Sequence, residues 1–525
     1  MKKAAENRPH SPLSAALALP AFLAAAVLFA LPVLADDPKA AGQENKPAIE
    51  KKSEIGPERQ SVTQHTLNLG GRELRYTATA GTVILREEDG TPKASVFYIA
   101  YTLDGVKDPA QRPLTFSFNG GPGSSSVWLH LGVLGPRRVL MDDEGLALQP
   151  PYRLVDNEAS VLDLTDLVFI DPVSTGYSRA VPGEDPKQFH GLGEDIKAVG
   201  DFIRLYTGRQ ARWSSPKFLI GESYGTTRAA GLSGYLQNNH GFYLNGIMLV
   251  SSILNFQTAR FDVGNDLPYP LFLPTYTATA WYHKQLPADL QSKPLREVLD
   301  EAEEFALGDY WSALAKGGRL DAAGRSAIAA KLSRLTGLSE EWIERANLRI
   351  DIHRFTKELM RAERRTVGRL DSRFVGIDDD QNGTEFEHDP SMTAIMGPYT
   401  ATINDYLRRD LDYTSDLSYE ILTGKVRPWK FEEGRYADVA GTLREAMTKN
   451  PSLKIYVANG YFDLATPYFA TEYTFDHLGL DAGLAGNVSM SYYEAGHMMY
   501  IQKKSLLQQK KDLAAFYASA IPKAK

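Results

Sequence analysis

Six short apolar runs, separated by stretches of helical composition, constrain the fold of this chain more than any other feature of its sequence. Each run has the length of one strand, and the runs lie at 114–118, 167–170, 217–220, 247–251, 453–458 and 488–493. Continuous apolar strands are typical of parallel sheets, because helices cover both faces of such sheets. The sequence therefore predicts an α/β fold with a mostly parallel central sheet and helices on both faces.

Two regions depart from this alternation. Upstream of the runs, turn signals separate strand-like segments at 66–69, 74–79, 81–85 and 94–103. Residues 286–370 are rich in Ala, Leu, Glu, Lys and Arg with apolar spacings of three and four, which predicts helices. We therefore expect one α/β domain formed by 61–260 and 440–525, with 261–439 inserted as a mainly helical cap or lid.

The N-terminus has the features of a secretory signal peptide in residues 1–35. A basic start is followed by the apolar run 13–34, and small residues precede a cleavage point after Ala35. An uncleaved membrane anchor is the alternative, since the run approaches the length of a membrane span. We expect cleavage, export to the periplasm or beyond, no stable membrane insertion afterwards, and a flexible lead-in at 36–60.

Composition excludes several classes of function. The chain has no cysteine, which excludes disulfides, thiolate metal sites and a cysteine nucleophile. Its 58 Lys+Arg against 65 Asp+Glu give a net charge of −7, so no broad basic surface for nucleic acid is expected.

A candidate nucleophile, Ser223, lies in the sequence Gly-Glu-Ser-Tyr-Gly at 221–225. The motif follows an apolar run and precedes a helix-compatible stretch, which is the context of a nucleophile elbow. An ordinary glycine-rich turn is the alternative. Asp463 and His497 each follow a later predicted strand, in the chain order that this motif requires of its triad partners. Because parallel strands end at one edge of a sheet, these three residues are candidates for a Ser-His-Asp triad.

A glycine-rich loop at 119–126, Asn-Gly-Gly-Pro-Gly-Ser-Ser-Ser, follows the first apolar run. Its backbone N–H groups, together with that of Tyr224, can stabilise a developing oxyanion. The alternatives are a tight turn and a phosphate loop; the latter is disfavoured because no Gly-Lys-Ser/Thr follows.

These motifs resemble the successive signatures of the serine carboxypeptidase family. The matching stretches span 115–500 in order and lie at 119–126, 170–178, 221–225, 460–463 and 495–498. The resemblance, which is to a bacterial-type member, implies an α/β-hydrolase fold with a helical cap. It further implies a triad of Ser223, Asp463 and His497, oxyanion donors at Gly121 and Tyr224, and a substrate-carboxylate site formed by Asn119, Gly120 and Glu222.

Glu222 can bind a substrate carboxylate only when it is protonated or shares a proton, because two carboxylates at contact distance cannot both stay ionised. A surface carboxylate near a helix N-terminus is the alternative role for Glu222. The chain also departs from the family pattern. Ser117 replaces a usual Trp, Val133 replaces a usual acidic residue, and Ser124 replaces a usual Cys. The first two changes affect the network that holds the carboxylate in the family.

The acidic segment 378–389 matches most positions of a calcium loop. It carries Glu385 where an apolar residue is expected and Asp389 where Glu is favoured, so a solvated acidic loop is the preferred interpretation. No metal or organic cofactor is expected.

The sequence thus predicts an exported serine carboxypeptidase that forms an acyl-enzyme on Ser223 and acts on the C-termini of peptides or proteins. An esterase, amidase or acyltransferase on the same scaffold stays open, because fold and triad do not specify the acyl donor. A non-catalytic binding protein is disfavoured, since a decayed enzyme would be expected to have lost at least one triad residue.

Overall fold

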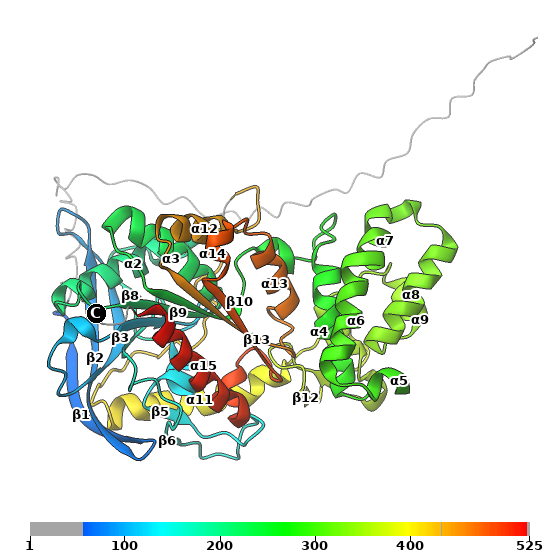
Figure 1. The fold of residues 1–525 in the computed structure, drawn as a ribbon. Helices are drawn as coiled ribbons and strands as arrows, with labels where there is room; N and C mark the ends of the chain where they lie inside the picture. The colour runs from blue at the N-terminus through cyan, green and yellow to red at the C-terminus, as the bar shows by residue number, and fades with distance from the viewer. Residues whose placement is uncertain (1–55, 432, 522–525) are drawn as a thin grey trace, which may run out of the picture. The chain divides into compact units, whose positions relative to one another are not determined.

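A ten-stranded sheet forms the centre of the computed structural model, which describes residues 56–431 and 433–521 (Figure 1). The strand order is β1-β2-β3-β7-β4-β9-β10-β13-β14, and β8 pairs with β3 beside this path. The strands are β1 Gln60–Leu69, β2 Arg72–Arg86, β3 Pro92–Leu103, β4 Leu114–Phe118, β7 Asp166–Ile170, β8 Arg179–Ala180, β9 Lys217–Ser223, β10 Gly246–Ser252, β13 Lys454–Gly460 and β14 Val488–Tyr493. The predicted signal peptide at 1–35 and residues 36–55 of the predicted lead-in lie outside the described residues.

The strands from β7 to β14 along this order are all parallel to their neighbours. β1, β2 and β3 form an antiparallel meander, and β3 is antiparallel to β7. Every residue of β4 and β7 is buried, which explains why these strands are apolar without alternation. The six apolar runs correspond to β4, β7, β9, β10, β13 and β14, so the predicted mostly parallel sheet is confirmed.

The meander corrects one detail of the sequence analysis. The segments 74–79 and 81–85 belong to a single strand, β2, and Gly81 does not end it. Gly81 instead permits a close backbone approach, since a Cβ atom there would lie 2.9 Å from the carbonyl oxygen of Arg59. The turn lies at Gly70 and Gly71, whose φ angles of 58° and 79° are accessible to glycine at little cost.

Helices pack on both faces of the sheet, as predicted. α11 and α15 contribute to the core on one face, whereas α2, α3 and α12 contribute to the core on the other. Adjacent residues of β9 alternate between the two cores: Phe218 and Ile220 belong to the first and Leu219 to the second. These helices are α2 Leu192–Arg209, α3 Tyr224–His240, α11 Pro390–Arg409, α12 Ala440–Lys449 and α15 Lys503–Ala520.

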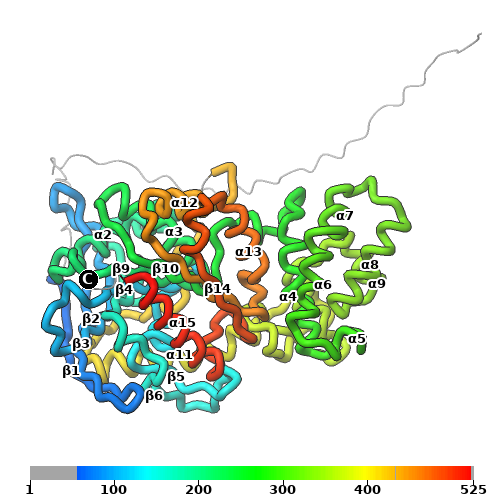
Figure 2. Tube along the Cα trace, in the orientation of Figure 1, coloured from blue at the N-terminus to red at the C-terminus, as the bar shows by residue number. Residues whose placement is uncertain are grey.

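A helical insertion between β10 and β13 builds a third core, together with α13 and the loop that precedes α13. Figure 2 shows α4 of the insertion beside α13, and α6 packs against α4. α11 falls within the range 261–439 but packs against the sheet through Ile403 and Tyr406. The remaining helices are α1 Val127–Leu129, α4 Pro268–Tyr282, α5 Ala288–Gln291, α6 Leu295–Phe305, α7 Trp311–Lys316, α8 Ala322–Thr336, α9 Glu340–Arg345, α10 Ile352–Glu358, α13 Tyr468–Asp476 and α14 Ala482–Ala485.

Two short hairpins lie outside the central sheet. They are formed by β5 Arg137–Val139 with β6 Leu154–Asp156, and by β11 Thr366–Val367 with β12 Val375–Gly376. Within the described part of the chain, no helix combines the length and the apolar composition needed to cross a membrane.

Candidate active site

Ser223 lies at the turn between β9 and α3, where β9 ends at Ser223 and α3 begins at Tyr224. Its backbone has φ 60° and ψ −131°, a conformation that costs a non-glycine residue free energy. The turn is also too tight for a side chain at Gly221, where a Cβ atom would lie 2.1 Å from the carbonyl oxygen of Gly225. A side chain at Gly221 is therefore excluded on steric grounds. A strained turn from strand to helix is also the geometry that a nucleophile elbow requires.

Asp463 and His497 lie in the loops that follow β13 and β14. His497 Nδ1 and Asp463 Oδ2 are 2.8 Å apart. Asp463 also accepts hydrogen bonds from the backbone N–H groups of Ala465, at 2.8 Å, and Thr466, at 3.0 Å, and from the Thr466 hydroxyl at 2.7 Å. These bonds fix the carboxylate, which in turn orients the imidazole ring.

The charge state of His497 follows from two opposing effects. Burial disfavours the imidazolium, but the adjacent Asp463 carboxylate outweighs burial, so the pKa of His497 is raised. Because Asp463 engages Nδ1, Nε2 is the ring nitrogen that can take up or deliver a proton elsewhere. This arrangement suits a general base that becomes a cation during the reaction.

Ser223 and His497 both line a pocket of about 310 Å³. The pocket also includes Asn119, Gly120, Gly121 and Glu222. The structure thus brings six of the eight predicted site residues to one cavity. The other two, Asp463 and Tyr224, are buried and do not line the cavity.

The loop 119–126 meets the nucleophile turn backbone to backbone. A Cβ atom at Gly120 would lie 2.5 Å from the backbone nitrogen of Tyr224, and one at Gly225 would lie 2.8 Å from the carbonyl oxygen of Phe118. Because only glycine permits this approach, the two loops are fixed against each other. Gly121 and Tyr224, the predicted oxyanion donors, belong to these two touching segments.

Glu222 is 3% exposed, and burial raises its pKa to about 7. Its Oε2 accepts a hydrogen bond from the hydroxyl of Tyr500. Asn119 accepts a bond from the N–H of Leu129 at 3.1 Å through Oδ1, while its Nδ2 is buried and forms no hydrogen bond of normal geometry with another described residue. The Asn119 side chain is nevertheless close enough to Glu222 to lower the pKa of that carboxyl slightly against the effect of burial. Near neutral pH the site therefore places one protonatable carboxyl beside one amide donor.

Three further residues of this region, Tyr500, Trp128 and Arg369, were not predicted from the sequence. Trp128 lines the pocket and donates through Nε1 to Ser124 Oγ at 2.8 Å. Arg369 lines the pocket from the loop between β11 and β12. The proximity of Tyr500 to His497 in the sequence was a usable signal, but nothing around Arg369 in the sequence marks it as a pocket residue.

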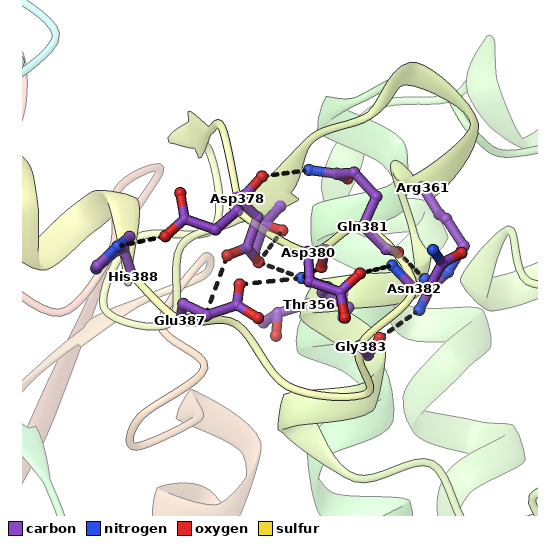
Figure 3. A network of polar contacts seen from close by, with 12 residues as sticks. Thr356, Arg361, Asp378, Asp380, Gln381, Asn382, Gly383, Glu387 and His388 are labelled. Atoms are coloured by element: carbon purple, nitrogen blue, oxygen red, sulfur yellow. Dashed lines mark hydrogen bonds and ion pairs between the residues drawn. The ribbon is translucent and has the colours of Figure 1, made fainter.

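The carboxylates of the acidic loop 378–389 take part in a network of hydrogen bonds and ion pairs (Figure 3). Lys357 forms an ion pair with Asp378 and donates to the carbonyl oxygen of Asp380. Asp378 also accepts from the Thr366 hydroxyl at 2.9 Å and from the N–H of Glu387 at 3.1 Å. No set of three or more potential metal ligands occurs among residues 56–431 and 433–521. The carboxylate of Asp378 is thus compensated by Lys357.

Comparisons with known proteins agree with this geometry. A family model described as serine carboxypeptidase matches residues 75–508. Serine carboxypeptidase-like 2 of Arabidopsis thaliana is 28% identical over 155 residues, which are 29% of this chain and 32% of that protein. Pheromone-processing carboxypeptidase KEX1 of Saccharomyces cerevisiae is 36% identical over 156 residues, 28% of this chain and 20% of that protein. The chain thus spans a third or less of the length of these curated relatives.

The crystal structure of Kex1(delta)p, a prohormone-processing carboxypeptidase from Saccharomyces cerevisiae, superposes with a TM-score of 0.52. The superposition covers 84% of this chain and 91% of that chain at 18% sequence identity, so it concerns the fold alone. Together with the strand order, it confirms the predicted α/β-hydrolase fold.

Proposed function

Because this chain belongs to the serine carboxypeptidase family, we propose that it hydrolyses the C-terminal peptide bond of peptides or proteins, with Ser223, His497 and Asp463 as its triad. One observation carries the proposal. Ser223 is held in a strained turn, in the same pocket as His497, whose ring is oriented by Asp463 at 2.8 Å. This combination of nucleophile, base and orienting carboxylate supports acyl transfer.

In the proposed mechanism, Ser223 Oγ attacks the carbonyl carbon of the scissile bond while His497 Nε2 takes the hydroxyl proton. The N–H groups of Gly121 and Tyr224 stabilise the oxyanion. Collapse of the tetrahedral intermediate breaks the C–N bond, and His497 returns the proton to the leaving amine. A water molecule then attacks the acyl-enzyme, again with His497 as base, and releases the shortened peptide and free Ser223.

The C-terminal carboxylate of the substrate is proposed to bind at Asn119, Gly120 and Glu222. The Nδ2 donor of Asn119, which forms no hydrogen bond of normal geometry among the described residues, and the raised pKa of Glu222 support this role. Protonated Glu222 can donate to a carboxylate, whereas ionised Glu222 would repel it.

Domain roles and location follow from the same reasoning. We propose that 61–260 and 440–525 form the catalytic domain and that the helices of 261–439 act as a cap. We also propose export of the protein, to the periplasm of a bacterium or beyond, on the strength of the signal features at 1–35.

Three substrates test the proposed function: an N-blocked dipeptide with a free C-terminus, its C-terminal amide, and an aryl ester of the same acyl group. A carboxypeptidase should cleave the free acid in clear preference to the amide. Turnover of the ester alone, or equal cleavage of acid and amide, would contradict the proposal and favour an esterase or amidase on this scaffold.

A further inference from the structure

Arg369 lies in the pocket that contains Ser223 and His497, although it comes from the β11–β12 loop. Backbone contacts fix this loop against the triad loops. The N–H of Leu464 donates to the carbonyl oxygen of Arg369 at 3.1 Å, and the N–H of His497 donates to that of Leu370 at 2.6 Å. Two backbone hydrogen bonds therefore hold the main chain at Arg369 and Leu370 against the loops that carry Asp463 and His497.

The side chain of Arg369 is partly buried, yet its guanidinium is paired with no residue of 56–431 or 433–521. Among the described residues it forms neither an ion pair nor a side-chain hydrogen bond. Other buried arginines are paired: Arg228 contacts Asp195 at 2.8 Å, and Arg373 contacts Asp371 at 2.7 Å. Burial lowers the pKa of Arg369 and outweighs the opposite effect of the carboxylates of Asp389 and Asp463, which reflects the cost of holding this cation out of water.

The charge of the pocket favours an anion. Arg369 and Arg427 line it, whereas the only carboxyl group among its described lining residues is that of Glu222. Because the pKa of Glu222 is about 7, this carboxyl is mostly neutral in mildly acidic solution. The carboxylates of Asp389 and Asp463 lie close enough to act on the charge of Arg369, but neither lines the pocket or pairs with the guanidinium. A carboxylate bound in the pocket could therefore still form an ion pair with Arg369.

We propose that Arg369 is a substrate-binding residue that holds a carboxylate of the substrate. A planar guanidinium can donate two parallel hydrogen bonds to a carboxylate, which gives both affinity and orientation. The carboxylate comes either from the C-terminus of the peptide or from an acidic side chain beside the scissile bond. This inference rests on the proposed function. It adds a contact from a permanently charged group to the contact that protonated Glu222 is proposed to make.

Matched pairs of N-blocked dipeptides distinguish the two sources. The first pair is Phe-Leu as free acid and as amide. The second compares Phe-Glu with Phe-Gln, and the third compares Glu-Leu with Gln-Leu, all as free acids. The ratio of kcat/KM within each pair is measured for wild type, R369Q and R369M; the last retains the aliphatic stem if R369Q fails to fold.

The matched control is R260Q. Arg260 is exposed, lies outside this pocket, and is near enough to lower the pKa of Arg369, so R260Q removes the same charge nearby. Labelling of Ser223 by a fluorophosphonate verifies that each variant keeps an intact site.

We expect the R369Q and R369M variants to lower the ratio at least tenfold in one pair, with R260Q leaving all ratios within about twofold. A fall in the first pair identifies the C-terminal carboxylate, and a fall in the second or third identifies an acidic side chain. Unchanged ratios in labelled, folded variants would overturn the role of Arg369 while leaving the proposed function intact. A wild-type protein that cleaves none of these dipeptides would contradict the proposed function itself.

Discussion

The pocket at the ends of the parallel strands and the acidic loop 378–389 both gather polar side chains, but they differ in how those groups are satisfied. In the loop, the carboxylate of Asp378 is paired with Lys357 and bonded to the chain around it. In the pocket, the Nδ2 donor of Asn119 and the guanidinium of Arg369 form no hydrogen bond of normal geometry with another described residue, and Ser223 is held at φ 60°.

This difference has an energetic meaning. Unpaired buried donors and strained backbone each cost on the order of 1–3 kcal/mol of stability. Such costs are found at sites where the unpaired group binds a ligand or the strained residue takes part in a reaction. Polar groups that are already paired contribute to the fold and have little left to offer a ligand. Mutations in the pocket should therefore lower turnover more than stability. Mutations in the loop should lower stability more than turnover.

The largest expected effect is on turnover at the pocket. Ser223→Ala removes the nucleophile and should lower kcat/KM on an N-blocked dipeptide by roughly 10⁴-fold or more, with the unfolding midpoint unchanged or raised. Ser214→Ala is the matched control, because Ser214 is exposed on the loop before β9 and should keep full activity. More than 1% residual activity in the Ser223 variant would rule out the assigned nucleophile.

Asp463→Asn should have the next largest effect. An amide at this position can present an N–H group to His497 Nδ1, which favours the wrong tautomer of the ring, and kcat should fall by about 10³- to 10⁴-fold. Steady-state kinetics and thermal unfolding are measured side by side. If kcat of the folded variant fell by less than tenfold, Asp463 would not be the residue that orients His497.

The acidic loop should show the opposite response. Asp378→Asn leaves the buried ammonium of Lys357 without its closest counter-charge, which should lower the free energy of unfolding by about 3–5 kcal/mol while kcat of the folded protein stays within twofold. Chemical denaturation and kinetics check this pair of outcomes. Asp379→Asn is the matched control, because the neighbouring Asp379 side chain is 83% exposed and its loss should cost at most about 0.5 kcal/mol.

Calcium provides a second test of the same loop. With Lys357 paired to Asp378, added Ca²⁺ or a chelator should not move the unfolding midpoint of the wild-type protein. A calcium-dependent rise of several degrees would show that the loop binds the ion and would weaken the contrast with the pocket.

The sequence predicted the parts of the molecule that depend on local pattern. The runs that became β4 and β7 are apolar throughout because both faces are buried. Chain order and strand ends made Ser223, Asp463 and His497 the candidates for a triad. The elbow glycines were recognisable for a steric reason that is also local. Together these features specified the central sheet and the edge at which the candidate residues lie.

What the sequence did not indicate depends on contacts between distant segments. Tyr500 bonds Glu222 across 278 positions of the chain, and neither residue signals the other. Arg369 reaches the pocket only because the β11–β12 loop docks on the triad loops through backbone bonds. Backbone hydrogen bonds leave no side-chain pattern in the sequence, so such docking has to be seen in three dimensions.

The smallest expected change in activity concerns pH and the carboxyl group of Glu222. Below its pKa of about 7 this group is protonated and can donate to a substrate carboxylate; above it, the ionised group repels the substrate. The preference for free acid over amide should therefore fall roughly tenfold between pH 6 and pH 8.5, since one hydrogen bond to a charged group is worth about 1.5 kcal/mol. Glu222→Gln should make this ratio independent of pH, whereas Glu494→Gln, at an exposed position near His497, should not. Titration of His497 affects the cleavage of both substrates alike, so its effect cancels in the ratio. If the Glu222→Gln variant retained the wild-type pH dependence of the ratio, that dependence would belong to another group.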